Sequence, residues 1–233
     1  MTADRHALPL HARFLILAHD PATGRPLVDD TRLTVGFAGA ALLELAHRGV
    51  VRVEGEGRRA RVRATGVAPP PELAEVLERA VDRSPKDAVG RFGGASSWTD
   101  RAGRLRTDTW QRLEVAGYVR PETHKVLGVL PRTRWRQLTG EHATSVDAVR
   151  SVLDGNGSPD TELPALVAVA HATGVLRQLF PAVGAKDLKA RAELVTKDLW
   201  GGPAVAKAIS DINAAIVAAT TAAVSAAAVG GSS

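Results

Sequence analysis

Residues 164–180 read PALVAVAHATGVLRQLF, and this stretch decides the fold class. Apolar side chains surround the whole circumference of the helix that it predicts, and a helix of this kind is buried. The stretch is shorter than the run of about 20 apolar residues that crosses a bilayer. Pro164 suits the first helical turn, and Pro181 ends the helix. Because a buried helix needs amphipathic neighbours, the sequence predicts a mainly α protein, a helical bundle around a buried central helix at 164–180.

Apolar spacing elsewhere predicts the surrounding helices and two short β-hairpins. Helical patterns occupy residues 36–47, 72–83, 99–116, 145–153, 186–199 and 203–229. Residues 8–19 suit either a helix or a strand, and residues 84–94 suit a loop or a short helix. Asp29–Thr31 offers an N-cap, and Gly49 and Gly117 offer C-caps. Alternation predicts strands at 50–53 and 58–65 for one hairpin, and short strands at 118–119, 125–130 and 135–138 for the other.

Composition narrows the class of partner. The 233 residues carry a formal net charge of +5 and include no cysteine. The positive charge suggests an anionic partner, either nucleic acid or an acidic membrane surface. The lack of cysteine excludes disulfides, thiolate zinc sites and cysteine catalysis, and it fits a reducing cytoplasm. The opening residues have no pattern of a signal peptide. The uncharged residues 212–229 are mostly alanine, which predicts a packed amphipathic helix rather than a membrane span.

Signals for catalysis are weak. The seven histidines lack the spacings of metal sites, and the chain has no nucleophile elbow, phosphate loop or dinucleotide fingerprint. His171 lies in the apolar stretch, where a core histidine is the more common role. We therefore expect no enzymatic activity, no metal and no cofactor.

The first arginine cluster comprises Arg101, Arg104 and Arg106, at the start of the predicted helix 99–116. A helix N-terminus already carries positive charge, so cations are unfavourable there unless an anion binds among them. Backbone N–H groups and guanidinium groups together bind phosphate well. A phosphate site and an exposed cluster without a ligand are nearly equal alternatives.

A second cluster lies in the first predicted hairpin and comprises Arg58, Arg59, Arg61 and Arg63. On a strand, the last three side chains project to one side. A solvated face that discourages edge pairing is the usual role of such charges. A secondary anion-binding patch is the alternative.

The second hairpin, within 118–138, combines apolar and basic residues. The apolar positions are Val126, Leu127, Val129 and Leu130. Lys125, Arg132, Arg134 and Trp135 flank them. This combination suits a membrane interface, a self-association surface or simple core packing.

Four stretches together resemble the Golgi phosphoprotein 3 family. They are FLILAHDPATGRPL from Phe14, GFAGAALLELAHRGVVRVEGEGRR from Gly36, RLEVAGYV from Arg112 and LPALVAVAHATGVLRQLFP from Leu163. Their order and spacing match the family across nearly the whole chain. The resemblance implies one domain over 1–229. Residues 230–233 are expected to form a disordered tail, as chain ends commonly do. The abundance of Ala, Gly, Val and Arg suggests a bacterial member from a high-GC genome.

The resemblance also implies a non-catalytic peripheral membrane protein that binds phosphatidylinositol 4-phosphate or a related phosphoinositide. Eukaryotic members hold the head group with a tryptophan just before the first signature helix, an arginine within that helix and two arginines of a later helix. An apolar hairpin enters the bilayer and takes part in self-association. Those members also bind the cytoplasmic tails of glycosyltransferases.

Carried over to this chain, the resemblance gives a candidate site. Ala38 replaces the arginine of the first helix, and no tryptophan lies between Leu27 and Gly39. The predicted head-group residues are Arg101, Arg104, Arg106 and Arg32, and the predicted tip of the membrane-inserting hairpin is Val126 and Leu127. We expect a cytoplasmic protein associated with the inner face of a membrane, with anionic phospholipid and cytoplasmic tails of membrane proteins as partners, self-association through 118–138, and no nucleic acid.

A DNA-binding regulator is the rival hypothesis. LLELAHRGVVRV from Leu42 and WQRLEVAGYVRP from Trp110 share one plan, in which a helix ends at glycine and a basic hairpin follows. This helix-plus-wing pattern is typical of many DNA-binding modules. Competition between duplex DNA and anionic liposomes distinguishes the two hypotheses. A small hydrolase, the third class, has no supporting motif.

Overall fold

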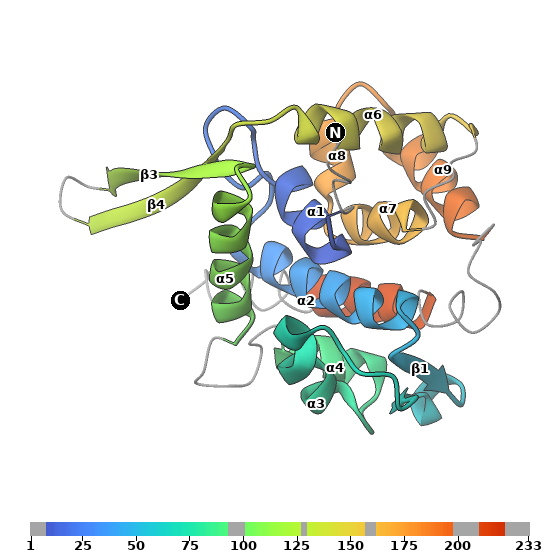
Figure 1. The fold of residues 1–233 in the computed structure, drawn as a ribbon. Helices are drawn as coiled ribbons and strands as arrows, with labels where there is room; N and C mark the ends of the chain where they lie inside the picture. The colour runs from blue at the N-terminus through green and yellow to red at the C-terminus, as the bar shows by residue number, and fades with distance from the viewer. Residues whose placement is uncertain (1–7, 93–100, 127–129, 157–161, 198–209, 222–233) are drawn as a thin grey trace, which may run out of the picture.

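A computed structural model describes residues 8–92, 101–126, 130–156, 162–197 and 210–221 of the chain. Helices dominate it (Figure 1). The helices are α1 (Leu10–Leu17), α2 (Asp30–His47), α3 (Ala74–Ala80), α4 (Pro85–Phe92), α5 (Arg101–Val115), α6 (Glu141–Leu153), α7 (Leu163–Ala172), α8 (Val175–Leu179) and α9 (Ala185–Lys197), followed by helical residues 210–221. Two short 3₁₀ helices, η1 (Gly57–Arg59) and η2 (Pro71–Leu73), complete the helical set. The strands are β1 (Val51–Glu54), β2 (Arg61–Ala64), β3 (Val119–Val126) and β4 (Leu130–Gln137).

The core lies where α1, α2 and α7 meet. Every residue of α1 is buried, and so is every residue of α7 from Leu163 to Ala170. Small side chains allow this close packing. A Cβ atom at Gly36 of α2 would lie 2.5 Å from Thr173 Cγ2 and 2.6 Å from Phe14 Cζ, so only glycine lets the three elements approach this closely. The prediction of a mainly α bundle with two hairpins and a buried central segment is confirmed.

The central segment is two helices, so the prediction of one helix over 164–180 is wrong. α7 ends at Ala172, and Gly174 adopts a left-handed backbone with φ of +82° before α8 begins. Thr173 is buried, and its hydroxyl donates to Val169 O at 2.8 Å. Only glycine takes the left-handed conformation without strain. α8 turns partly outward, and its Arg177 is exposed.

Local signals place the ends of α2 as predicted. Asp29 is the N-cap, and its carboxylate accepts from Arg32 N at 2.9 Å. Gly49, with φ of +67°, follows the last turn. A buried carboxylate then joins α2 to α1, because Glu44 Oε2 accepts from Leu10 N at 2.5 Å and Glu44 Oε1 accepts from Arg48 Nε at 2.5 Å. The bond from Leu10 N supplies an acceptor for one of the backbone N–H groups that have no partner within the first turn of α1.

The undecided segments are also resolved. Residues 10–17 of the stretch 8–19 form helix α1 rather than a strand, and residues 85–92 of the stretch 84–94 form α4. In the described part of the terminal helix, Ile212 and Ile216 are buried. The predicted tail at 230–233 lies outside the described residues, and the single-domain prediction stays a prediction.

The two hairpins differ from their predicted lengths in opposite directions. β1 and β2 pair over four residues, from Val51↔Ala64 to Glu54↔Arg61. The predicted strand 58–65 is therefore too long, because Arg58 and Arg59 belong to η1. β3 and β4 pair over eight residues, from Val119↔Gln137 to Val126↔Leu130, where only short strands were predicted. The β3–β4 hairpin extends away from the helical body (Figure 1).

Candidate lipid-binding surface

The side chain of Arg106 extends from α5 to the start of α2. Its Nη1 donates to Asp30 Oδ1 at 3.0 Å and to Thr34 Oγ1 at 3.1 Å. Its side chain is 21% exposed, whereas the Asp30 side chain is 74% exposed. Arg106 is therefore a partly buried cation whose counter-ion faces solvent, and a competing anion can reach it without disturbing the core.

Arg104 points in another direction. It lies two residues before Arg106 on α5, which corresponds to about 200° around a helix. Its Nη2 lies 3.7 Å from Glu75 Oε1 of α3, and its side chain is 65% exposed. An exposed pair at this distance contributes little to stability. Arg101 is the first residue of α5, and its side chain lies outside the described part of the chain.

Arg32 completes the predicted set from the other side of α2. Its Nε lies 3.2 Å from Asp29 Oδ2, and its Nη1 lies 3.6 Å from the position that a Cβ would take on Gly174. Arg32 thus approaches the α7–α8 turn, whereas Arg106 lies between α2 and α5. The structure gives Arg32, Arg104 and Arg106 three separate carboxylate partners and does not gather them around one cavity.

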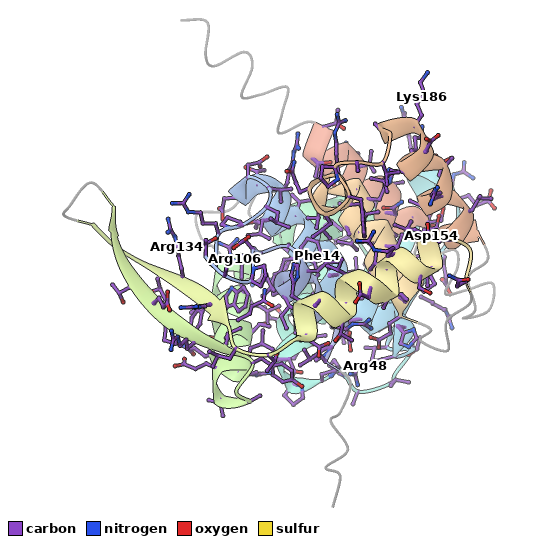
Figure 2. The ribbon with its side chains drawn as sticks, turned by 90° about the horizontal axis from the view of Figure 1, so that it is seen from above. Phe14, Arg48, Arg106, Arg134, Asp154 and Lys186 are labelled. Carbon is purple, nitrogen blue, oxygen red and sulfur yellow. The ribbon has the colours of Figure 1, made fainter. Side chains whose placement is uncertain are left out.

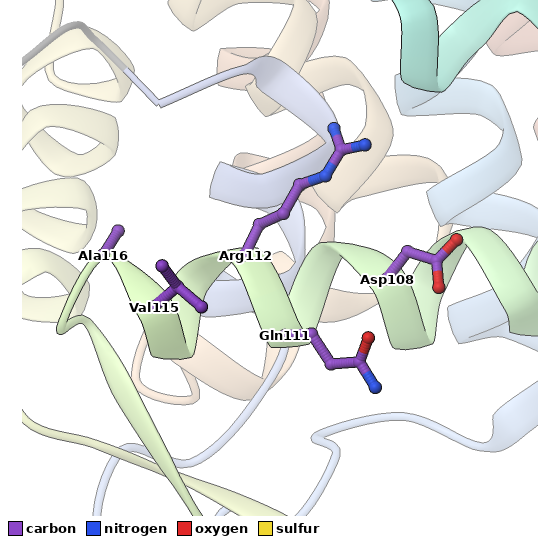
Figure 3. Close-up of a pocket in the computed structure, with 5 residues that line it drawn as sticks. All are labelled: Asp108, Gln111, Arg112, Val115 and Ala116. Carbon is purple, nitrogen blue, oxygen red and sulfur yellow. The ribbon is translucent and has the colours of Figure 1, made fainter.

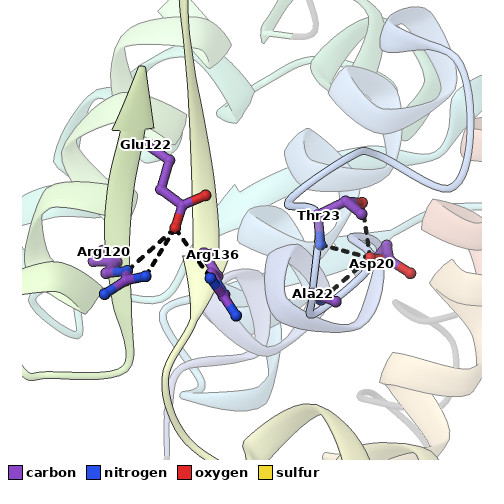
Figure 4. A network of polar contacts seen from close by, with 6 residues as sticks. All are labelled: Asp20, Ala22, Thr23, Arg120, Glu122 and Arg136. Carbon is purple, nitrogen blue, oxygen red and sulfur yellow. Dashed lines mark hydrogen bonds and ion pairs between the residues drawn. The ribbon is translucent and has the colours of Figure 1, made fainter. Parts of the chain in front are cut away.

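The β3–β4 hairpin carries a basic face, of which only Arg134 was among the residues predicted to flank its apolar tip. Arg120, Glu122, Arg134 and Arg136 occupy alternate positions, so they share one side of the ladder. Glu122 Oε1 accepts from Arg120 Nη2 at 3.0 Å and from Arg136 Nη1 at 3.4 Å (Figure 4). The hydrogen bond from Arg120 is the main cause that lowers the pKa of Glu122. Two arginines therefore share one carboxylate on this face, and Arg134 adds a third cation to it. The alternation of charged residues along 120–136 is the sequence signal that reveals this face.

Aromatic rings hold the base of the hairpin against the body. The ring of Trp135 stacks on that of Trp110 of α5, with centroids 5.8 Å apart and an interplanar angle of 10°. His19 meets Trp110 edge-on at 5.0 Å, and its Nδ1 donates to Leu15 O at 2.8 Å. Burial lowers the pKa of His19 to about 4, so the ring is neutral at pH 7.

The turn after α1 supports the same base. Asp20 Oδ1 accepts from Thr23 N at 2.7 Å, from Thr23 Oγ1 at 2.7 Å and from Ala22 N at 3.2 Å (Figure 4). The bond from the Thr23 hydroxyl is the main cause that lowers the pKa of Asp20. Gln137 N donates to Pro21 O at 3.1 Å, and Gly24 packs on the Trp135 backbone. The hairpin therefore emerges from a fixed base, on the side of the molecule where Arg106 and Arg134 lie (Figure 2).

The predicted tip lies at the end of this hairpin. Val126 is the last residue of β3, but its side chain is outside the described part of the chain. Leu127 lies entirely outside it. The membrane-inserting tip stays a prediction.

The second arginine cluster is less uniform than expected. Arg59 lies in η1, so only Arg61 and Arg63 project to one side of β2. Arg63 pairs with Asp82, and its Nε also lies 3.7 Å from Glu54 Oε2. Part of this cluster is therefore neutralised.

A broad hollow of about 420 Å³ lies along the outer side of α5 (Figure 3). The described residues that line it are Asp108, Gln111, Arg112, Val115 and Ala116. Arg112 Nη1 lies 3.1 Å from Glu72 Oε2, and Val115 is 90% exposed. Since one helix supplies all of these residues, the hollow is an open surface and does not enclose a ligand.

Other functional classes find little support in the described residues. No group of three or more His, Asp or Glu side chains there is placed to hold a metal ion. Nor does any helix within these residues have the length and apolar character to cross a bilayer. The DNA-binding hypothesis requires a helix that can enter the major groove of DNA. The helix of the first helix-plus-wing unit, α2, is unsuited to this, because every residue from Leu33 to Ala46 is buried.

Comparison with known families decides the classification. Residues 10–212 match the family model of Golgi phosphoprotein 3, which covers most of the chain. The chain belongs to the Golgi phosphoprotein 3 family. No curated protein matched it at the threshold for a relative.

Family membership gives Ala38 a clear meaning. In the Golgi phosphoprotein 3 resemblance, an arginine of the first signature helix occupies this position. Ala38 is only 1% exposed and lies inside the core in this chain. The chain therefore has no cation at that point, and Arg106, which donates to Asp30 and Thr34, has the least exposed side chain among its described head-group candidates.

Proposed function

We propose that the chain is a peripheral membrane adaptor, a non-catalytic protein that binds anionic lipid at the cytoplasmic face of a membrane. The projecting β3–β4 hairpin is the observation that carries the proposal. Three arginines lie on one face of it, two of them sharing the Glu122 carboxylate, and its strands end in Val126 and Leu130 at the far end from the body. Each basic residue near an acidic leaflet contributes about 1 kcal/mol to membrane binding.

The head group binds beside Arg106 in this proposal. A phosphate replaces the Asp30 carboxylate as the acceptor for Arg106 Nη1, and the Thr34 hydroxyl donates a second bond. Charge-assisted bonds to phosphate are stronger than neutral ones. Arg104 and Arg101 on α5, and Arg32 on α2, then supply long-range attraction to a phosphoinositide such as phosphatidylinositol 4-phosphate.

Liposome co-sedimentation tests this assignment. Vesicles contain neutral lipid alone or neutral lipid with phosphatidylinositol, its 4-phosphate or cardiolipin. We expect the 4-phosphate to bind best, and the double variant R104A/R106A to lose roughly thirtyfold in affinity for it, since two charges that contribute about 1 kcal/mol each disappear. The control R79A/R91A removes two exposed arginines on α3 and α4 and should bind as the unmodified chain does.

A single carboxylate sharpens the test. In the variant Asp30→Asn, Arg106 keeps its place but loses its anionic partner, so binding of the 4-phosphate should become several-fold tighter. Unchanged binding in both D30N and R104A/R106A would remove Arg106 from the site. Binding to all anionic vesicles alike would leave a basic surface without head-group selectivity.

The adaptor role also predicts protein partners. Cytoplasmic tails of membrane proteins and a second copy of the chain, bound through 118–138, are the expected partners. Sedimentation velocity with and without vesicles measures self-association. A deletion of residues 127–129, which include the predicted tip residue Leu127, should abolish self-association, and a monomer under both conditions would exclude it.

A further inference from the structure

A second hollow lies far from the β3–β4 hairpin, beside the β1–β2 hairpin. Its volume is about 490 Å³, which is within the usual range for small-molecule sites. Three elements form its walls: the loop from η1 to β2, the start of α4, and helical residues 210–221. Its charged lining residues are Arg58, Arg61, Lys86, Asp87 and Asp211. In Figure 1, β1 and the β3–β4 hairpin lie at opposite sides of the molecule.

One cation of this hollow is fixed in place. Arg61 Nη1 donates to Arg58 O at 2.8 Å and to Ala60 O at 2.8 Å. These two bonds hold one nitrogen of the guanidinium group against the loop. The group is therefore ordered before any ligand arrives, which reduces the entropy lost on binding.

Two further cations stand free at the rim. The side chains of Arg58 and Lys86 are exposed, and no carboxylate in the described part of the chain pairs with either of them. In contrast, Asp87 is engaged in a helix cap. Its carboxylate accepts from Ser84 Oγ at 2.8 Å, and Ser84 Oγ accepts from Asp87 N at 3.1 Å.

The opposite wall is formed by helical residues 210–221. Three alanines make it largely apolar, and Asp211 of the same helix also lines the hollow; the alanines are Ala214, Ala215 and Ala218. Pockets with an apolar wall and a few convergent charged groups are typical of small organic ligands. The combination selects a molecule with an anionic group at one end and a short carbon skeleton at the other.

We propose that this hollow binds a small phosphate monoester. Its phosphate lies between Arg58, Arg61 and Lys86, and its carbon skeleton lies against Ala214 and Ala218. Phosphate suits the cations better than carboxylate does, because it offers acceptors to two guanidinium groups and an ammonium group together. The site shares no residue with the lipid surface above, so either assignment can fail without the other.

Calorimetry with soluble probes tests the proposal. The probes are glycerol 3-phosphate, inorganic phosphate and glycerol. Glycerol 3-phosphate should bind, inorganic phosphate should bind more weakly, and glycerol should not bind. The double variant R58A/K86A should lose at least tenfold in affinity for glycerol 3-phosphate, whereas the matched control R79A/R91A should keep it.

A second variant tests the apolar wall independently. Ala218→Leu fills part of the space for the carbon skeleton, so it should weaken glycerol 3-phosphate while inorganic phosphate binds as before. Vesicles with phosphatidic acid present the same monoester on a lipid. If these vesicles compete with glycerol 3-phosphate and R58A/K86A abolishes the competition, the source is a lipid head group; without competition, the source is a soluble metabolite. Absence of binding by every phosphate probe, or equal binding by R58A/K86A, would overturn the proposal.

Discussion

The two hairpins of this protein share a local plan and differ in their relation to the body. Each follows a helix that ends at a glycine with a left-handed backbone, Gly49 before β1 and Gly117 before β3. β1 and β2 are four residues long and bury Val51, Val53 and Val62 against the bundle. β3 and β4 are eight residues long and extend beyond it (Figure 1). Strand length, rather than arginine content, therefore decides which hairpin reaches outward.

Charge is distributed differently as well. In the first hairpin, Arg63 pairs with Asp82, and Arg61 donates to backbone carbonyls. In the second, Arg120 and Arg136 share Glu122, and Arg134 lies on the same face of the ladder. A basic face on a projecting hairpin suits a flat anionic surface, whereas a basic rim around a hollow suits a small anion.

The largest expected effect is a loss of vesicle binding when three arginines are removed from the second hairpin but not from the first. The triple variant R120A/R134A/R136A should weaken binding to vesicles with phosphatidylglycerol roughly a hundredfold, since each arginine near an acidic surface contributes about 1 kcal/mol. The matched variant R58A/R59A/R61A removes the same charge from the first hairpin and should lose less than threefold. Co-sedimentation at low salt measures both, and equal losses would mean that only net charge matters.

Protonation of His19 at acid pH should destabilise the base of the second hairpin. The folded-state pKa of His19, about 4, is below the ordinary 6.5, so the unfolded chain binds a proton first as the pH falls. The stabilisation is complete above pH 6.5 and is lost as the pH falls towards 4. Between pH 7 and pH 4.5 the unmodified chain should lose about 2 kcal/mol more unfolding free energy than the variant His19→Gln.

Urea unfolding at the two pH values gives this difference. Amide hydrogen exchange shows which part of the fold loses stability in acid. Backbone amides around Val119 and Gln137 should exchange faster, whereas those of β1 and β2 should keep their protection relative to the rest of the fold. His11 is buried with a pKa of about 4 as well, and it is present in both proteins, so its contribution cancels. Identical pH dependence in both proteins would remove His19 from this role.

The smallest expected effect tests what the hairpins share. Gly49→Ala and Gly117→Ala should each lower the unfolding free energy by about 1 kcal/mol, because a Cβ disfavours the left-handed backbone. Gly90 of α4 is the control, since it has no positive φ and no neighbouring atom in the way of a Cβ. Gly90→Ala should raise stability by about 0.5–1 kcal/mol. Thermal denaturation measures all three, and a neutral result at Gly49 and Gly117 would contradict the shared plan.

Signals within a few residues predicted much of the fold. Asp29 caps α2, Gly49 and Gly117 follow α2 and α5, and apolar residues on all sides marked α7 as buried. Each of these depends on backbone sterics or on helical periodicity, which a single segment carries by itself. The break at Gly174 escaped prediction because glycine inside an apolar helical pattern is also compatible with an unbroken helix.

The candidate site was less accessible to sequence reasoning. The cluster Arg101, Arg104 and Arg106 was visible, but the direction of each side chain depends on the elements that pack beside α5. Arg106 meets Asp30 and Arg104 meets Glu75, and these pairs join residues far apart in the sequence. The hollow between Arg58, Lys86 and Ala218 likewise joins three distant segments. The basic face of the β3–β4 hairpin is different, because the alternation of charged residues along these two strands can be counted in the sequence.

The central claim is that one hairpin enters the membrane interface and the other does not. Because the chain has no cysteine, the single variants Leu127→Cys and Glu56→Cys place one environment-sensitive fluorophore at the predicted tip of the second hairpin and one between the strands of the first. With vesicles of phosphatidylcholine and phosphatidylinositol 4-phosphate, we predict a blue shift and increased emission at position 127 and no change at position 56. Equal shifts at both positions, or a shift at position 56 alone, would contradict the account.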